Sequence, residues 1–212
     1  MDTDSHTDTD TAATDTAETA ERLPRGAASA ERVVEAARAC FAERGISGTR
    51  MGDVARRARM SRPNLYSFVA GRAELLELVA LARLHELGLQ LEERARGLDG
   101  DVGEALVDQI IETTRLGRED PEFIALADAM PRFALTVMLT SGDSPIHKIN
   151  ARIFGPLLAR AMAEGRLRSD VPIDALHEWL QNIVTLLASR DDLNDEAQRT
   201  MVRRFVLPGL LS

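Results

Sequence analysis

The 212-residue sequence predicts an all-α protein of about nine helices. From Ser29 onward apolar residues recur at three- and four-residue steps, and no segment alternates between apolar and polar residues as a strand does. Hydrophobic residues make up 44% of the chain, which is enough to fill a helical core. Gly45 and the segment 97–103 interrupt the periodic pattern, as the ends of helices do.

Each helix is placed by its apolar repeat and its boundary residues. The first is expected over Ser29–Arg44, and two short helices follow, over Met51–Ala58 with Thr49 as its cap and from Ser61 to about Val69. A long helix is expected over Arg72–Arg96. The remaining helices are predicted at 102–117, 121–139 with an interruption at Pro131, 144–164, 172–190 and 194–207.

Charge is distributed very unevenly along the chain. Residues 1–21 hold seven acidic residues and no Lys or Arg, and residues 1–23, rich in Asp, Thr and Ala, are predicted to be a disordered tail. Residues 22–72 hold eleven arginines against four acidic residues, although the whole chain has a net charge of −8. A basic segment of this kind is what binding to phosphates requires. An arginine-rich, solvated helix surface is the alternative.

The residues that enzymes and metal sites use are sparse. The single Cys40 excludes an internal disulfide and a cysteine-built zinc site, and its apolar surroundings predict a small buried hydrophobe. The four histidines, His6, His85, His147 and His177, lack metal-ligand spacing. No glycine-rich phosphate loop or nucleophile elbow is present. We therefore expect no metal, no cofactor and no catalysis, and an all-α enzyme is the weakest alternative.

Targeting signals are also absent from the pattern. No apolar stretch approaches the roughly 18 residues of a membrane span, and the acidic N-terminus has no apolar core of a signal peptide. We therefore expect a cytoplasmic protein without a membrane partner.

The first three predicted helices form a helix-turn-helix unit, with the motif at about residues 49–68. The small Ala55 allows the two short helices to approach closely, and Val54 and Leu65 can close the core between them. The recognition helix then presents polar side chains to the major groove of DNA.

The segments Thr49–Ala55, Ala58–Tyr66 and Arg72–Leu76 resemble the signature of the TetR family of transcriptional regulators. The resemblance covers about the first quarter of the chain after the tail. It implies a DNA-binding domain at 24–72 and a helical effector-binding and dimerisation domain at 73–212. It also implies a homodimer on a palindromic double-stranded operator, working as a repressor that an unknown small, largely apolar effector releases.

The resemblance assigns phosphate contacts to Tyr66 and Arg72, and Thr49 is expected to offer its hydroxyl and nearby helix amides to another phosphate. Arg62 and Asn64 are the candidates for base reading, because Arg suits guanine and Asn suits adenine. The alternatives are that Tyr66 only packs and that Arg62 contacts only a phosphate. The complete set of expected DNA contacts is Thr49, Arg50, Ser61, Arg62, Pro63, Asn64, Tyr66, Ser67, Phe68 and Arg72.

Three positions depart from the family pattern. Arg59 stands where the family usually has Gly, so a positive φ there would cost about 1 kcal/mol. Val69 replaces the usual Phe, and Phe68 stands where His is common. Phe68 is a candidate for the groove rim or a thymine methyl.

Apolar stripes on the last two predicted helices indicate a dimer interface that joins two copies in a four-helix bundle. The residues expected there are Leu176, Leu180, Ile183, Leu187, Met201 and Phe205. The alternative is that these stripes pack within one subunit. A helical protein-interaction module without operator binding is the alternative for the whole chain.

Methionine and aromatic residues in the body suit an adaptable apolar pocket, although they suit a plain core equally well. The predicted pocket residues are Phe123, Met130, Phe133, Met138, Phe154, Met162 and Trp179. Breaks at Pro131 and 141–143 indicate a mouth near them.

Overall fold

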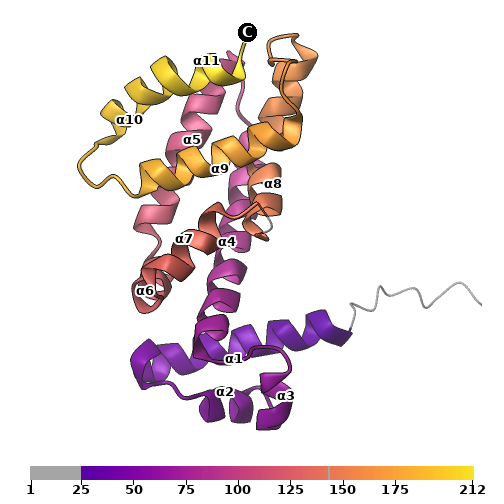
Figure 1. Ribbon diagram of the computed structural model, residues 1–212, viewed down its shortest axis with the longest axis vertical. Helices are drawn as coiled ribbons and strands as arrows, with labels where there is room; N and C mark the ends of the chain where they lie inside the picture. The colour runs from indigo at the N-terminus through magenta and orange to yellow at the C-terminus, as the bar shows by residue number, and fades with distance from the viewer. Residues whose placement is uncertain (1–24, 143) are drawn as a thin grey trace, which may run out of the picture.

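The computed structural model describes residues 25–142 and 144–212, and the tail predicted at 1–23 lies outside the described residues. Figure 1 shows an elongated molecule built from helices. The described ranges contain no strand, and their one β-bridge, between Leu167 and Leu211, is isolated. The all-α prediction is confirmed. None of the helices in these ranges combines the length and apolar character needed to cross a membrane.

Three helices form one end of the molecule, which we call the head (Figure 1). They are α1 (Arg25–Gly48), α2 (Met51–Arg57) and α3 (Arg62–Tyr66). The remaining helices form the body: α4 (Arg72–Arg96), α5 (Val102–Glu119), α6 (Pro121–Ala129), α7 (Arg132–Thr140), α8 (Ile146–Ala163), α9 (Ile173–Ala188), α10 (Asp195–Met201), a π-helical turn η1 (Val202–Val206) and α11 (Leu207–Leu210).

Local signals explain where several helices end. Gly45 has φ 72° and ψ 160°, which breaks the helical path of α1 at the predicted position, and a last turn continues to Gly48. Pro131 stands at the N-cap of α7 and separates it from α6, as expected. The start of α1 was predicted at Ser29, but the helix already begins at Arg25. The Ser29 hydroxyl instead accepts a hydrogen bond from Arg32.

Two hydrophobic cores lie along α4. The head core contains Val33, Val54 and Leu65, and it is completed by body residues of α4 and α6, including Leu76 and Leu126. The body core contains the second half of α4 together with residues of α5, α8, α9 and the C-terminal turns. Cys40 is buried in the head core, as predicted, and burial raises the pKa of its thiol. The head therefore closes its core only by packing on the body.

The turn between α2 and α3 holds Arg59 at φ 55°, and no other non-glycine residue in the described ranges has a positive φ. The turn is closed by the Met60 amide, which donates to the carbonyl oxygen of Ala55 at 3.0 Å. The positive φ considered for this position is therefore present, although the residue is not glycine. An arginine in this region carries steric strain because its Cβ crowds the backbone.

We predict that Arg59→Gly stabilises the protein by about 1 kcal/mol, because glycine adopts this conformation without strain. The midpoint of thermal unfolding should rise by about 2–4 °C at a fixed protein concentration. Arg59→Ala is the matched control, since it removes the same charge and keeps the Cβ. Equal stabilisation by both substitutions would show that the side chain, and not the backbone, is the source of strain.

Candidate nucleic-acid interface and ligand cavity

Helix α3 presents a polar face to solvent. Ser61 is its N-cap, and the Ser61 hydroxyl accepts a hydrogen bond from the Asn64 amide at 3.3 Å. Leu65 and Val69 point inward and are 0% and 2% exposed. The exposed residues on and beside this short helix are Ser61, Arg62, Pro63, Asn64, Tyr66 and Ser67. The structure therefore brings these six predicted residues together on one surface, with Phe68 half-buried at its edge.

Thr49 does not have the capping role predicted for it. The N-cap position of α2 is Arg50, whose amide donates to the Asp53 carboxylate at 3.2 Å. Thr49 is only 3% exposed, and its hydroxyl donates to the carbonyl oxygen of Gly45 at 2.9 Å. This inward hydrogen bond holds the turn after α1. The Thr49 hydroxyl is therefore engaged inside the head and is not presented to DNA.

Arg72 ties the same turn to the start of α4. One of its terminal nitrogens donates to the Thr49 carbonyl oxygen at 2.8 Å, and the other donates to that of Ile46 at 2.5 Å. The side chain remains exposed, and a guanidinium has five N–H donors. Arg72 thus has a structural role that its place in the sequence pattern does not reveal. Its guanidinium also has N–H donors that these two hydrogen bonds do not use.

A hollow in the head lies beside α3. It is lined by Ser47, Thr49, Arg50, Met51, Gly52, Arg62, Tyr66 and Arg72, so three arginines and no acidic residue surround it. The Arg62 guanidinium lies directly over Gly52, where an added Cβ would come within 2.6 Å of its Nη2 atom. Tyr66 is 48% exposed at this hollow. Positive side chains without a facing carboxylate favour an anion such as a backbone phosphate.

Charged residues connect the head to the body. Arg38 of α1 contacts Glu86 of α4 and Glu122 of α6, each at 2.5 Å. Arg83 of α4 donates to both oxygens of Asp120 at 3.1 and 2.6 Å, and it pairs with Glu86 at 2.9 Å. We call these five residues the junction cluster. Sequence reasoning missed it, because only the Arg83–Glu86 spacing on one helix gives a local signal.

The junction cluster shifts the protonation of its acids. The hydrogen bond from Arg83 lowers the pKa of Asp120, whose side chain is only 6% exposed and also caps α6 by accepting from the Phe123 amide. The hydrogen bond from Arg38 lowers the pKa of Glu86. Both carboxylates are therefore held ionised near neutral pH.

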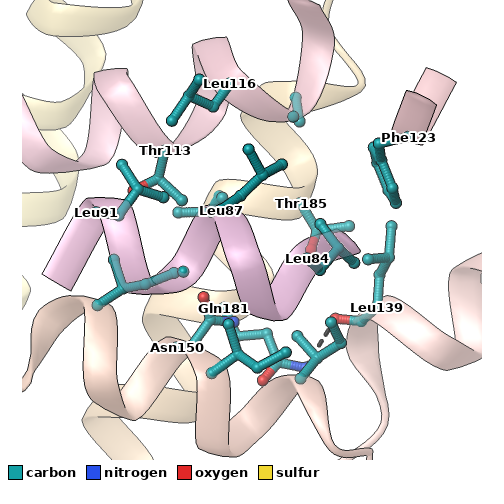
Figure 2. A pocket seen from close by; sticks show the side chains of 17 residues that line it. Leu84, Leu87, Leu91, Thr113, Leu116, Phe123, Leu139, Asn150, Gln181 and Thr185 are labelled. Atoms are coloured by element: carbon teal, nitrogen blue, oxygen red, sulfur yellow. Dashed lines mark hydrogen bonds between the residues drawn. The ribbon is translucent and has the colours of Figure 1, made fainter. Parts of the chain in front are cut away.

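The body contains an apolar cavity of about 100 Å³ between α4, α5, α8 and α9. Figure 2 shows Leu84, Leu87 and Leu91 of α4 along it, with Phe123 at one side. Its polar side chains are Thr113, Asn150, Gln181 and Thr185, and none of its lining residues is charged. Gln181 is 1% exposed and donates through Nε2 to the Leu139 carbonyl oxygen at 2.7 Å.

The cavity differs from the predicted pocket, and of the residues predicted to line it only Phe123 does so. Met130 and Met138 belong to the head core, and Phe154 is fully buried in the body core. Phe133 and Met162 face solvent at 81% and 58% exposure, and Trp179 packs against Gly209. Leucine and isoleucine of α4 and α8 line the space instead, because composition alone does not show which helix faces surround a void.

The dimer stripe predicted on α9 is also partly wrong. Leu176, Leu180 and Leu187 are 3%, 0% and 3% exposed and pack inside the body core of one chain. Ile183 and Met201 are half-buried, whereas Phe205 is 72% exposed. On the outward face of α9, Leu186 is 52% exposed. Leu186 and Phe205 are the large apolar side chains that α9 and the C-terminal turns leave exposed. The alternative of packing within one subunit holds for the three buried leucines.

Comparison with known proteins gives the same assignment for the head. The family model described as bacterial regulatory proteins, tetR family, matches residues 33–79. This range spans most of α1, all of α2 and α3, and the start of α4. No curated protein sequence matches the chain.

Solved structures share the fold over the whole described molecule. The R. erythropolis transcriptional repressor QsdR has 21% identity and a TM-score of 0.64, with 89% of this chain and 98% of that chain covered. RolR, solved in complex with resorcinol, has 20% identity and a TM-score of 0.57, with 88% and 89% covered. Salmonella enterica GusR has 25% identity and a TM-score of 0.50, with 89% and 98% covered.

The exposed polar helix, its basic surroundings and the all-helical body define a helix-turn-helix, DNA-binding transcriptional regulator. The family model matches this chain over residues 33–79, so the head is similar to the DNA-binding domain of TetR-family regulators.

We predict that the junction cluster makes stability fall at acid pH. The folded state lowers the pKa of Asp120 and of Glu86. Their contribution to the free energy of unfolding is therefore present above the pKa of about 4 that they have in the unfolded chain, and it is lost as the pH falls through their folded-state pKa. Asp120→Asn keeps an oxygen that can cap α6 but carries no charge. This substitution should lower the free energy of unfolding by about 1–3 kcal/mol at neutral pH. It should also make the loss of stability at acid pH less steep, as measured by denaturant unfolding.

The exposed Asp191 provides the control, since Asp191→Asn should leave the stability and its pH profile unchanged. If the stability of the Asp120→Asn variant fell with acid pH as steeply as that of the wild type, the role of the junction cluster would be contradicted.

Proposed function

We propose that the chain binds a palindromic operator as a homodimer and represses transcription until a small, largely apolar effector releases it. The observation that carries the proposal is α3, which displays polar side chains beside a hollow lined by three arginines. A helix of this kind fits the major groove, and arginines beside it suit the flanking phosphates. The repressor QsdR, which shares the fold, supports repression as the direction of control.

The residues divide by role. Arg62 and Asn64 read base edges from the start of α3, where both side chains are exposed. Arg50, Tyr66 and Arg72 surround the hollow and contact phosphate, whereas Ser61, Pro63, Ser67 and Phe68 lie around them and complete the surface. Phosphate contacts fix register without carrying sequence information, and base contacts supply the preference.

The effector site is the cavity of the body. It lies between α4 and three other body helices, and α4 continues directly into the head. Phe123 belongs to both the cavity lining and the head core, so a molecule in the cavity contacts a residue on which the head packs. The effector then favours a head spacing that misfits the operator, with a coupling of about 1–3 kcal/mol. RolR, solved with resorcinol, supports a small-molecule effector.

The proposed roles predict different effects on DNA binding. Tyr66→Phe and Arg50→Ala should weaken binding to all duplexes by about tenfold, because a charge-assisted phosphate contact is lost. Arg62→Ala should reduce discrimination at one base pair by about 1–3 kcal/mol. Fluorescence anisotropy with DNA from beside the protein's own gene, and with a scrambled duplex, measures both effects.

Arg94→Ala is the control, because Arg94 is exposed near the far end of α4. This substitution removes one positive charge, as Arg50→Ala and Arg62→Ala do, but it removes it from the body. It should leave both affinities unchanged. If the wild-type protein binds none of the upstream fragments at low salt, the chain is a helical interaction module and the operator proposal fails.

The homodimer forms through the C-terminal helices, where Leu186 and Phe205 are large, apolar and exposed. We predict that Phe205→Asp produces monomers, since it buries a charge in an apolar interface. Phe133→Asp places the same change at another exposed phenylalanine, on α7, and should leave the dimer intact. Light scattering coupled to size-exclusion chromatography measures the mass, and a Phe205→Asp variant that remains dimeric would exclude Phe205 from the interface.

A further inference from the structure

The cavity of the body restricts the chemistry of its occupant by size and charge. Its volume is about 100 Å³, somewhat below the roughly 150 Å³ of a leucine-lined cavity that binds benzene. Seventeen residues line it, and none is charged. An ion would lose its hydration there without gaining a counter-charge. The space therefore suits an uncharged molecule with an apolar body no larger than about one ring.

Among the residues that line the cavity, one fully buried polar atom lacks a hydrogen-bond partner. Gln181 of α9 lines the cavity at 1% exposure, and its Nε2 atom is bonded to the carbonyl oxygen of Leu139 (Figure 2). The Oε1 atom of the same amide is buried and has no hydrogen-bond partner. Because the Nε2 bond fixes which way the amide faces, the oxygen is held as an acceptor. A buried acceptor of this kind gains when a donor reaches it.

Other glutamines show that position, rather than the amide itself, distinguishes Gln181. Gln109 is equally buried, donates through Nε2 to the Leu91 carbonyl oxygen at 2.8 Å, and has an Oε1 atom without a partner. Gln109 does not line the cavity. It therefore offers the same chemistry in the same body core without access to a cavity ligand.

We propose that the cavity binds a small, uncharged, one-ring molecule whose hydroxyl donates a hydrogen bond to Oε1 of Gln181. This inference rests on the proposed function, because it names the chemical class of the effector for that site. A carboxylate is a poor occupant, since it brings no donor to the oxygen and no cation lines the cavity. A plain hydrocarbon fills the space and leaves the acceptor unpaired.

Three molecules of similar shape test the proposal: phenol, toluene and benzoate. Isothermal titration with the full chain should show phenol binding at least as tightly as toluene, and benzoate at least tenfold more weakly than phenol. The comparison of phenol with toluene is informative because a ligand whose hydroxyl is buried without a partner binds more weakly. A purely apolar cavity would therefore prefer toluene. Toluene binding tenfold tighter than phenol, or benzoate binding best, would overturn the proposal.

Gln181→Met keeps the length of the side chain and removes the acceptor. It should weaken phenol relative to toluene by about tenfold, whereas Gln109→Met should keep the wild-type order. Operator binding by both variants reports that each is folded. An unchanged phenol preference in Gln181→Met, or an equal loss in Gln109→Met, would contradict the role of Gln181.

The titrations separate this proposal from the proposed function. If phenol binds as expected and the operator complex persists at saturating phenol, the ligand class stands and effector release fails. If a different compound releases the operator while phenol does not bind, effector release stands and the ligand class is wrong.

Discussion

The structure depends on one constraint, which is that a single continuous helix belongs to two hydrophobic cores. Helix α4 has 25 residues and is therefore about 37 Å long. Leu75, Leu76 and Val79 at its start lie in the head core, whereas Leu91 and Ala95 near its end lie in the body core. Neither core closes without it. A close-packed helix shifts as a unit, so a change at the body end of α4 reaches the head.

Helix α6 adds a second connection beside α4. Its cap, Asp120, is bonded to Arg83 of α4, and its neighbour Glu122 is bonded to Arg38 of α1. Phe123, one residue further, packs in the head core and also lines the cavity. Three consecutive interactions therefore join the cavity, α4 and the head within one helical turn. This arrangement gives the proposed effector a short physical route to the head, made of packing and ion pairs rather than loops.

The sequence predicted the parts that local chemistry determines. Gly45, Ser61 and Pro131 act where their backbone and capping preferences require. Arg59 has the positive φ whose cost could be stated in advance, although its presence could not. The polar face of α3 follows from the inward positions of Leu65 and Val69. Long-range packing was not predictable in the same way. The apolar residues of α9 reach around the helix, so periodicity could not show that Leu180 packs inward while Leu186 faces solvent. The cavity depends on leucines that any core would use.

The most direct test of this account is the distance between the two heads of the dimer. Ala42 of α1 is exposed, and an Ala42→Cys substitution in a Cys40→Ala background provides a single site for a spin label. Pulsed dipolar spectroscopy then measures the distance between the two labels of the dimer. We expect one distribution of label-to-label distances in the DNA complex, and a distribution shifted to other distances when an effector occupies the cavity. An effector that releases DNA while the head-to-head distance stays at its DNA-bound value would contradict the coupling through α4.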